Sequence, residues 1–232
     1  MSAGPSTALI TGGNRGIGKA IVSHFLNMGW EVIAAGRDAD SLDALKTLPG
    51  GERVHPLVAD LSDPDAIKRL FDKASQQVKA LHVLVNNAGV GIYGPAEDLP
   101  IDAWDQMMTI NVRGAFLCSQ HAFRWMKRTG TKGHIVNISS VVGHKGYPNQ
   151  VGYSASKHAM MGMTKVMAKE WQPHGIRVTA ICPGGVATDM VQQARPDLDP
   201  AGLIQPEDVA RAVWFLVTSP GTVATDELHL RR

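Results

Sequence analysis

The chain has 232 residues, of which 44% are hydrophobic and 19% are charged, and it carries a formal net charge of +2. Such a chain can bury a sizeable core, and its composition excludes an intrinsically disordered protein. The near balance of acidic and basic residues provides no bulk charge for nucleic acid or a membrane surface, so we expect neither as a partner.

Cysteine and histidine usage excludes further classes. Cys118 and Cys182 are the only cysteines, too few for a disulfide framework or a four-cysteine zinc site. The nine histidines show neither H-x-x-x-H nor H-E-x-x-H spacing, so we expect no metal site. No apolar run approaches the roughly 20 residues that cross a bilayer, and the first residues lack the pattern of a secretory signal. We therefore expect a soluble, cytoplasmic protein.

Short aliphatic runs alternate with segments of helical periodicity along the whole chain. The clearest helix spans Ile17–Met28, where apolar residues recur on one helical face. This alternation predicts right-handed crossovers and one α/β domain, a doubly wound, Rossmann-type parallel sheet with helices on both faces. The predicted strands are Ala8–Ile10, Val32–Ala35, Val54–Val58, Val83–Val85, His134–Ile138, Ile176–Ile181 and a last strand at Leu228–Arg232.

A glycine-rich segment, Thr11-Gly-Gly-Asn-Arg-Gly-Ile-Gly18, follows the first predicted strand and opens the first helix. Glycines let a phosphate approach the backbone, and the start of a helix presents free N–H groups to an anion. Gly13–Lys19 also fits the beginning of the nucleotide triphosphate loop, G-x-x-x-x-G-K. The next position of that loop must be Ser or Thr to hold magnesium, and here it is Ala20. We therefore predict a dinucleotide-binding loop and reject a phosphotransferase.

The end of the second predicted strand indicates which dinucleotide is bound. A ribose 2′-OH usually meets an acidic residue there, whereas a 2′-phosphate calls for Arg. The strand is followed by Gly36 and Arg37, and Arg15 of the glycine loop lies on the same side. Two guanidinium groups can bind a phosphate through charge-assisted, bidentate hydrogen bonds. We predict NADP(H) rather than NAD(H); the alternative is that Asp38 contacts the ribose of NAD(H).

A tyrosine and a lysine, Tyr153 and Lys157, are four residues apart and share one face of a predicted helix. A free tyrosine has a pKa of about 10 and is a poor base near neutral pH. A nearby ammonium lowers that pKa, which would make Tyr153 a usable proton donor and acceptor. A buried strand that precedes the pair ends in Ser139 and Ser140, and alternation sends Ser139 to the other face of the strand.

Four motifs occur in the chain in a recognisable order: Thr11-Gly12-x-x-x-Gly16-x-Gly18, Asn86-Asn-Ala-Gly89, Tyr153-Ser-Ala-Ser-Lys157 and Pro183-Gly184. Together they resemble the single-domain short-chain dehydrogenase/reductase family, in particular its β-ketoacyl carrier-protein reductases and related carbonyl reductases. The resemblance covers Thr7 to about Leu230. It implies one domain over residues 1–232, with a cofactor half at about 7–145 and a catalytic and substrate half at about 146–230.

The resemblance also implies roles for individual residues. Ser140, directly before Val141-Val-Gly143, matches the family serine that polarises the substrate carbonyl. Asn111 matches the asparagine that supports a proton relay through water to the lysine. The implied catalytic set is Ser140, Tyr153, Lys157 and Asn111. The expected cofactor contacts are Gly12, Asn14, Arg15, Gly16, Ile17, Gly18, Arg37, Asp60, Leu61, Asn87, Ala88, Gly89, Tyr153, Lys157, Pro183, Gly184, Val186 and Thr188.

These residues predict an NADP-dependent oxidoreductase that transfers a hydride between nicotinamide and a carbonyl or secondary alcohol, in a small molecule or a thioester. A 3-oxoacyl-type reductase and a broad ketone reductase both fit. The alternatives are an NAD-dependent dehydrogenase of sugar alcohols or other hydroxy compounds, and a non-catalytic NADP redox sensor. A sensor would be expected to lack Tyr153, Lys157 or Ser140, yet all are present.

The segment after Met190 bears on the shape of the pocket mouth, and the helix that carries Tyr153 bears on the oligomeric state. Only Val191–Gln205 separates Met190 from the next predicted helix at Pro206, so we expect a short lid and an open pocket. We expect a homodimer or homotetramer. Methionines that follow Tyr153 either line an interface or pack in the core: Met160, Met161, Met163 and Met167.

Overall fold

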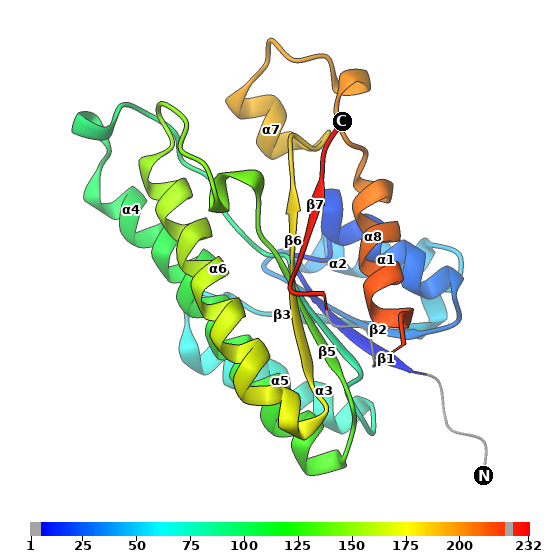
Figure 1. The fold of residues 1–232 in the computed structure, drawn as a ribbon. Coiled ribbons are helices and arrows are strands. Elements are labelled where there is room, and N and C mark those ends of the chain that lie inside the picture. The colour runs from blue at the N-terminus through cyan, green and yellow to red at the C-terminus, as the bar shows by residue number, and fades with distance from the viewer. Residues whose placement is uncertain (1–5, 221–224) are drawn as a thin grey trace.

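Seven parallel strands form one sheet, in the spatial order β3-β2-β1-β4-β5-β6-β7, in the computed structural model of the chain (Figure 1). The structure describes residues 6–220 and 225–232. The strands are β1 (Thr7–Thr11), β2 (Glu31–Gly36), β3 (Val54–Val58), β4 (Val83–Asn86), β5 (His134–Ile138), β6 (Arg177–Pro183) and β7 (Glu227–Leu230). The strand order reverses between β1 and β4, and open α/β sheets bind ligands at the carboxyl ends of the strands at such a point.

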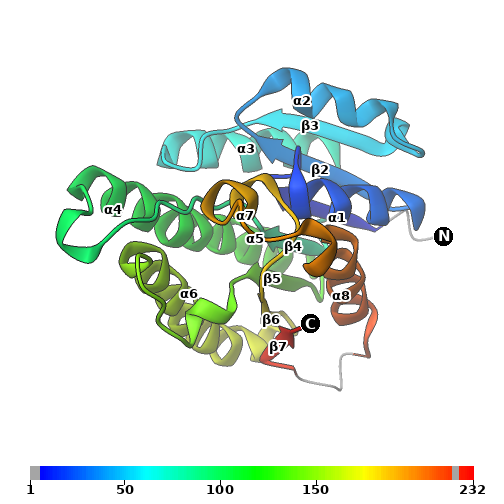
Figure 2. The same ribbon diagram turned by 90° about the horizontal axis from the view of Figure 1, so that it is seen from above.

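Helices cover both faces of this sheet (Figures 1 and 2). One face carries α1 and α8, and the other carries α3, α5 and α6. The helices are α1 (Gly16–Asn27), α2 (Ala39–Asp43), α3 (Pro64–Gln77), α4 (Ile101–Met107), α5 (Ala115–Thr129), α6 (Val151–Trp171), α7 (Asp189–Ala194) and α8 (Pro206–Thr218). Within the described ranges, no helix is long and apolar enough to cross a membrane.

Successive residues of one strand pack in two different hydrophobic cores, one on each face of the sheet. Ala8 and Ile10 of β1 pack in the core beneath α1 and α8, whereas Leu9 packs in the core beneath α3 and α5. All three are fully buried. A strand buried on both faces needs apolar side chains at successive positions, which is why these strands read as continuous aliphatic runs. The predicted single-domain, doubly wound parallel sheet is confirmed.

The observed bounds of β1, β2, β4, β6 and β7 differ from the predicted ones by one or two residues. β3 and β5 have the predicted bounds, but β7 covers Glu227–Leu230 rather than Leu228–Arg232. The ladder of β6 and β7 ends at the pair Pro183 and Leu230, where β6 itself ends. Beyond it, Arg232 donates a hydrogen bond to the Leu203 carbonyl at 2.9 Å.

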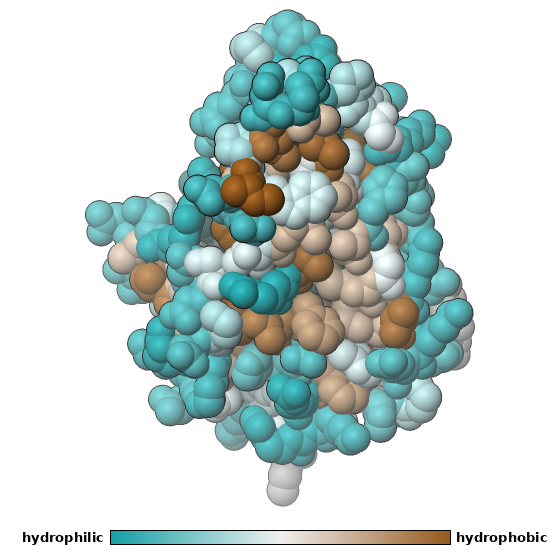
Figure 3. Space-filling model, turned by 90° about the vertical axis from the view of Figure 1, so that its left-hand side faces the viewer, coloured by the Kyte–Doolittle hydropathy of each residue, from teal (hydrophilic) through white to brown (hydrophobic). Residues whose placement is uncertain are grey.

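The methionines of α6 belong to the core of this chain. Met160, Met161 and Met167 are buried, so they give no reason to expect an interface. The exposed large apolar side chains on α6 are Val151 and Val166. Figure 3 shows the side of the molecule on which α4 and α6 lie, and there brown and tan side chains gather between teal margins. The homodimer or homotetramer stays a prediction.

A buried histidine at the start of β5 predicts how stability responds to acid. His134 is buried and its Nε2 lies 2.8 Å from Thr179 Oγ1. Burial, and then the charge of Arg177, lower the pKa of His134 to about 3. Below its ordinary pKa of about 6.5 the unfolded chain therefore binds a proton that the folded chain does not, so the free energy of unfolding falls as the pH falls.

We expect His134→Gln, which keeps a donor toward Thr179, to flatten this dependence by up to about 1 kcal/mol per pH unit. Urea unfolding curves between about pH 6.5 and 4.5 measure the slope. His158→Gln, at an exposed histidine of α6, is the control for the substitution itself. Equal slopes in the wild type and His134→Gln would show that His134 does not make folding acid-sensitive.

Candidate active site

A cavity of about 800 Å³ opens at the carboxyl ends of the central strands. Its lining comes from the segments that follow β1, β2, β3, β4, β5 and β6. A cavity of this size matches the usual range for small-molecule and cofactor sites, about 300–1,000 Å³. The strand order therefore brings together residues that are far apart in the sequence.

The glycine loop after β1 turns sharply and leaves no room for a side chain at its end. Gly12 and Gly16 have φ of 62° and 50°, in the left-handed region that favours glycine. At Gly18 an added Cβ would lie 2.0 Å from the Gly12 carbonyl oxygen. This close packing sets the backbone of the loop against the start of α1, whose N–H groups point toward the cavity end where an anion can bind.

The segment after β4 holds the glycine loop in place. The Thr11 hydroxyl oxygen accepts hydrogen bonds from the N–H groups of Asn87, at 3.0 Å, and Ala88, at 3.1 Å. The Asn87 side chain donates back to the carbonyls of Thr11, at 2.9 Å, and Gly12, at 3.1 Å. Asn87 lines the cavity, and its amide is used to fix the loop.

Two exposed arginines line one end of the cavity. Arg15 precedes α1, and Arg37 follows β2. The loops that carry them are tied together, because Asn14 Nδ2 donates to Ser41 Oγ at 2.9 Å. Within the part of the chain that the structure describes, neither guanidinium forms an ion pair. The two positive charges therefore face the cavity without a protein carboxylate on them.

Asp38 has another use in this structure. Its carboxylate caps α2 by accepting a hydrogen bond from the Ser41 N–H at 2.8 Å. Hydrogen bonds from the side chain and the N–H of Ser41 lower the pKa of Asp38. Gly36 is explained by the same link between the loops: an added Cβ would lie 2.8 Å from Asn14 Oδ1. A side chain at position 36, where an acidic ribose ligand would be expected, would thus displace the Asn14 side chain that links the two loops.

Tyr153, on the first turns of α6, lies beside Ser140 at the floor of the cavity. Burial raises the pKa of Tyr153, the neighbouring Tyr93 raises it further, and the Ser140 hydroxyl lowers it. The Tyr93 ring meets the Tyr153 ring edge-on, with centroids 5.8 Å apart. Ser140 begins the short 3-10 turn η5 (Val141–Gly143), where its hydroxyl oxygen accepts from the Val142 N–H at 3.3 Å.

Lys157 is 4% exposed and lies one turn further along α6. Its Nζ donates to the Ile138 carbonyl at 2.8 Å and lies 5.7 Å from the centroid of the Tyr153 ring. Burial lowers the pKa of Lys157 to about 8. The expectation that Lys157 lowers the pKa of Tyr153 is not met in the chain alone. The ammonium points at the end of β5, and burial of the phenol outweighs the lowering by Ser140.

Asn111 lies behind the cavity. It is fully buried in a π-helical segment, η4 (Met108–Gly114), a rare conformation that is often found at functional sites. Its Oδ1 accepts from the Val90 N–H at 2.8 Å, and its Nδ2 donates to the Val90 carbonyl at 2.8 Å and to Ser156 Oγ at 3.0 Å. Asn111 thus ties the segment after β4 to α6. Its part in ordering water stays a prediction.

The cavity includes almost every residue expected from the sequence. Of the predicted catalytic and cofactor residues, only Gly18 and Asn111 do not line it, since both support the lining from behind. Sequence reasoning missed Tyr93 and Ser41, which line it as well. Tyr93 lies in a segment without helix or strand periodicity, and the role of Ser41 depends on its contact with Asn14.

The short segment expected as an open lid contains a helix. Asp189, Met190, Val191 and Gln193 of α7 line the cavity. Figure 2, seen from above, shows α7 over the ends of the central strands. The parallel bridge between Val186 and Ile204 joins the two ends of the segment. The pocket mouth is therefore partly covered, although α7 is short.

Comparison with known proteins decides which family has this arrangement. A family model described as short chain dehydrogenase matches residues 6–199. The chain belongs to the short-chain dehydrogenases. As a member of that family of oxidoreductases, it acts on carbonyl and alcohol groups with a nicotinamide cofactor.

Several short-chain dehydrogenases resemble the chain over nearly its full length. It is 35% identical to the 3-oxoacyl-(acyl-carrier-protein) reductase FabG of Thermotoga maritima, over 95% of this chain and 93% of that protein. It is also 35% identical to a farnesol dehydrogenase of Aedes aegypti, over 97% of this chain and 94% of that protein. A solved structure described as ElxO with NADP bound has a TM-score of 0.90 and 27% identity, with 97% of each chain covered.

Proposed function

We propose that this short-chain dehydrogenase uses NADP(H) to interconvert a ketone and a secondary alcohol, with Ser140, Tyr153, Lys157 and Asn111 as its catalytic group. The observation that carries the proposal is the position of Tyr153 and Ser140 in one cavity with the glycine loop and with Arg15 and Arg37. The residues fit such a cofactor: the start of α1 and the Arg15 and Arg37 guanidinium groups suit the phosphates. When bound, the nicotinamide supplies or accepts the hydride.

The chain itself handles the proton. In the direction of reduction, the Tyr153 hydroxyl donates its proton to the substrate oxygen while Ser140 donates a hydrogen bond to the same oxygen. Because burial raises the pKa of Tyr153, the phenol is protonated near neutral pH and ready to act as the acid. Lys157 and the water that Asn111 is expected to order then return a proton to Tyr153. In oxidation the same steps run in reverse.

The proposed substrate is a small-molecule or thioester carbonyl compound, of the 3-oxoacyl type or drawn from a broad range of ketones. The name of the 3-oxoacyl-(acyl-carrier-protein) reductase supports a 3-oxoacyl substrate, whereas farnesol, in the name of the farnesol dehydrogenase, is a primary alcohol, so the relatives' substrates differ in kind. We also propose that residues of about 7–145 form the cofactor half of the domain and residues of about 146–230 the catalytic and substrate half. Tyr153, Lys157 and the α7 segment of the lining all come from the second.

Arg37 provides the test of the cofactor. We expect Arg37→Ala to weaken NADPH binding about tenfold or more, because a charge-assisted hydrogen bond contributes about 1.5–3 kcal/mol. NADH, which lacks the ribose 2′-phosphate, should bind within about twofold of its wild-type affinity. Quenching of protein fluorescence during titration with each nucleotide measures both affinities.

Arg124→Ala, at an exposed arginine of α5 outside the cavity lining, is the matched control and should bind both nucleotides as the wild type does. Tighter binding of NADH than of NADPH by the wild type would overturn the NADP(H) proposal and favour the NAD-dependent alternative, with Asp38 released from its cap. Binding of both nucleotides without any turnover of ketones or alcohols would favour a redox sensor.

A further inference from the structure

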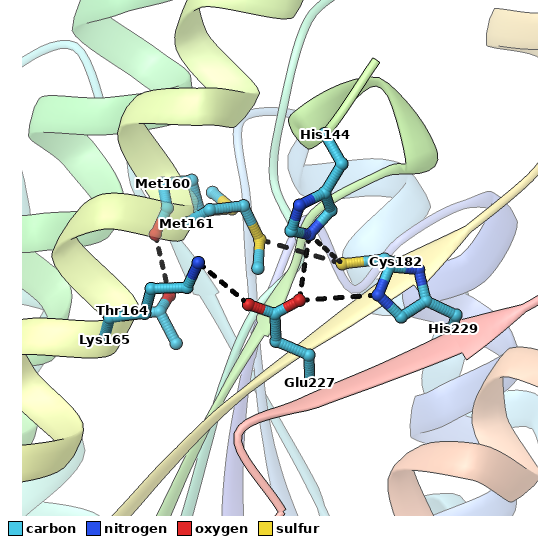
Figure 4. A network of polar contacts seen from close by, with 8 residues as sticks. All are labelled: His144, Met160, Met161, Thr164, Lys165, Cys182, Glu227 and His229. Carbon is cyan, nitrogen blue, oxygen red and sulfur yellow. Dashed lines mark hydrogen bonds and ion pairs between the residues drawn. The ribbon is translucent and has the colours of Figure 1, made fainter.

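A second cluster of reactive side chains lies at the edge of the sheet, apart from the cofactor cavity. It comprises His144, Cys182 and His229, which come from the segment after η5, from β6 and from β7 (Figure 4). Each offers one nitrogen or sulfur atom, and these atoms all lie within 4.8 Å of one another. None of the three lines the cavity.

The strand register creates this cluster. Cys182 and His229 are paired neighbours in the parallel ladder of β6 and β7, so their side chains stand on the same side of the sheet. Glu227 precedes His229 by two residues on β7 and shares that side. His144 reaches the group from the end of η5, and its Nε2 lies 3.9 Å from Cys182 Sγ. The strand register thus fixes Cys182 and His229 side by side, and the His144 side chain joins them.

The spacing of the atoms suits a tetrahedral metal ion. Zinc binds nitrogen at about 2.0–2.1 Å and thiolate sulfur at about 2.3 Å, which places two ligands of one ion about 3.3–3.6 Å apart. The sulfur–nitrogen distance of 3.9 Å needs only a small contraction to reach this value. Cys182 is fully buried, while the two imidazoles are about a third exposed, so an ion can enter from solvent between them.

Glu227 provides negative charge beside both rings. Its Oε2 lies 2.9 Å from His144 Nε2 and 3.4 Å from His229 Nε2, and its Oε1 is held by Lys165 Nζ at 3.2 Å. Because Oε2 faces the Nε2 atoms themselves and not the opposite ring nitrogens, the carboxylate adds negative charge where a cation would bind. A plain network of ion pairs would account for Glu227 and the histidines. That network does not include the Cys182 thiol, which donates to Met161 Sδ at 3.7 Å and lies 3.9 Å from His144 Nε2 (Figure 4).

We propose that His144, Cys182 and His229 bind one divalent transition-metal ion of the zinc type, with Glu227 beside the two rings. One thiolate with two imidazoles is a ligand set that favours zinc over magnesium or calcium. On binding, the Cys182 thiol releases its proton to solvent and the sulfur forms the bond to the metal. Because His144 follows Ser140 by four residues, the ion would join the Ser140 segment to β6 and β7, as a structural clamp.

Cobalt(II) tests the site directly, since a thiolate bound to cobalt gives a near-ultraviolet charge-transfer band. We expect chelator-treated full-length protein to develop this band on titration with Co²⁺ alone, to saturate at one equivalent, and to lose the band when Zn²⁺ is added. Cys182→Ser should abolish the band. His229→Asn should weaken Co²⁺ binding about tenfold or more. Cys118→Ala removes the other buried cysteine, which lies on α5, and should keep the full band.

The proposal would be overturned if the wild type showed no thiolate band at excess Co²⁺, or if the band persisted in Cys182→Ser. The cluster would then be an ion-pair network around Glu227 and not a metal site. Circular dichroism of each variant checks its folding. If Cys182→Ser fails to fold, His229→Asn decides, because His229 is exposed on an edge strand. Unchanged Co²⁺ affinity in His229→Asn would then count against the site. These spectra do not depend on the proposed NADP(H) activity.

Discussion

Tyr153→Phe is expected to lower kcat/KM for ketone reduction by about 10²- to 10⁴-fold, the range for loss of a positioned acid. The substitution removes the only atom that the proposed mechanism uses to protonate the substrate oxygen, while the ring still packs edge-on against Tyr93. NADPH affinity should change little, because the arginines and the glycine loop are untouched. Steady-state kinetics with a ketone or 3-oxoacyl thioester that the wild type reduces, together with nucleotide titration, separate the two effects.

Tyr147→Phe is the matched control. Tyr147 is exposed and does not line the cavity, so removal of its hydroxyl should leave the kinetics unchanged. A Tyr153→Phe enzyme that keeps a tenth or more of wild-type activity would contradict the role of Tyr153 as the acid and would direct attention to Tyr93. Loss of NADPH binding in the same variant would instead indicate that Tyr153 holds the cofactor.

The fold could be predicted because its causes are local. Buried parallel strands need continuous apolar runs, and helices packed on a sheet need one apolar face, so both leave a pattern in the sequence. The glycine loop is also recognisable, since Gly12, Gly16 and Gly18 lie within seven consecutive residues between β1 and the first turn of α1. Where contacts between distant residues determine the structure, the sequence pattern predicts less of it. The end of β7 is set by its partner strand, since β6 ends at Pro183, which pairs with Leu230.

The site could be predicted by its motifs but not by its electrostatics. Tyr153 and Lys157 stand where a helical face places them, yet the pKa of Tyr153 is raised in the chain alone. Burial and the ring of Tyr93 outweigh the Ser140 hydroxyl. The four-residue spacing predicts that the Lys157 ammonium lies near Tyr153, but only the structure shows that this ammonium donates to the Ile138 carbonyl.

The histidine and cysteine cluster was beyond any reading of the sequence. Metal motifs are recognised by short spacings on one helix or hairpin, whereas His144, Cys182 and His229 come from three separate segments. They meet because β6 and β7 pair with Cys182 opposite His229. The sequence therefore indicated no metal site, and the register of two parallel strands created the candidate.

Gly18→Ala is expected to weaken NADPH binding about tenfold or more and to lower the free energy of unfolding by about 1–3 kcal/mol, as overpacking does. The added methyl would lie 2.0 Å from the Gly12 carbonyl oxygen and 2.6 Å from Asn87 Nδ2, so the loop must move away from the start of α1. Gly162→Ala on α6 is the matched control, because nothing lies within 4 Å of its added methyl. In a helix, that exchange should stabilise the protein by about 0.5–1 kcal/mol and leave NADPH binding unchanged. If both variants bind NADPH as the wild type does, the close packing of Gly18 is not what shapes the phosphate site.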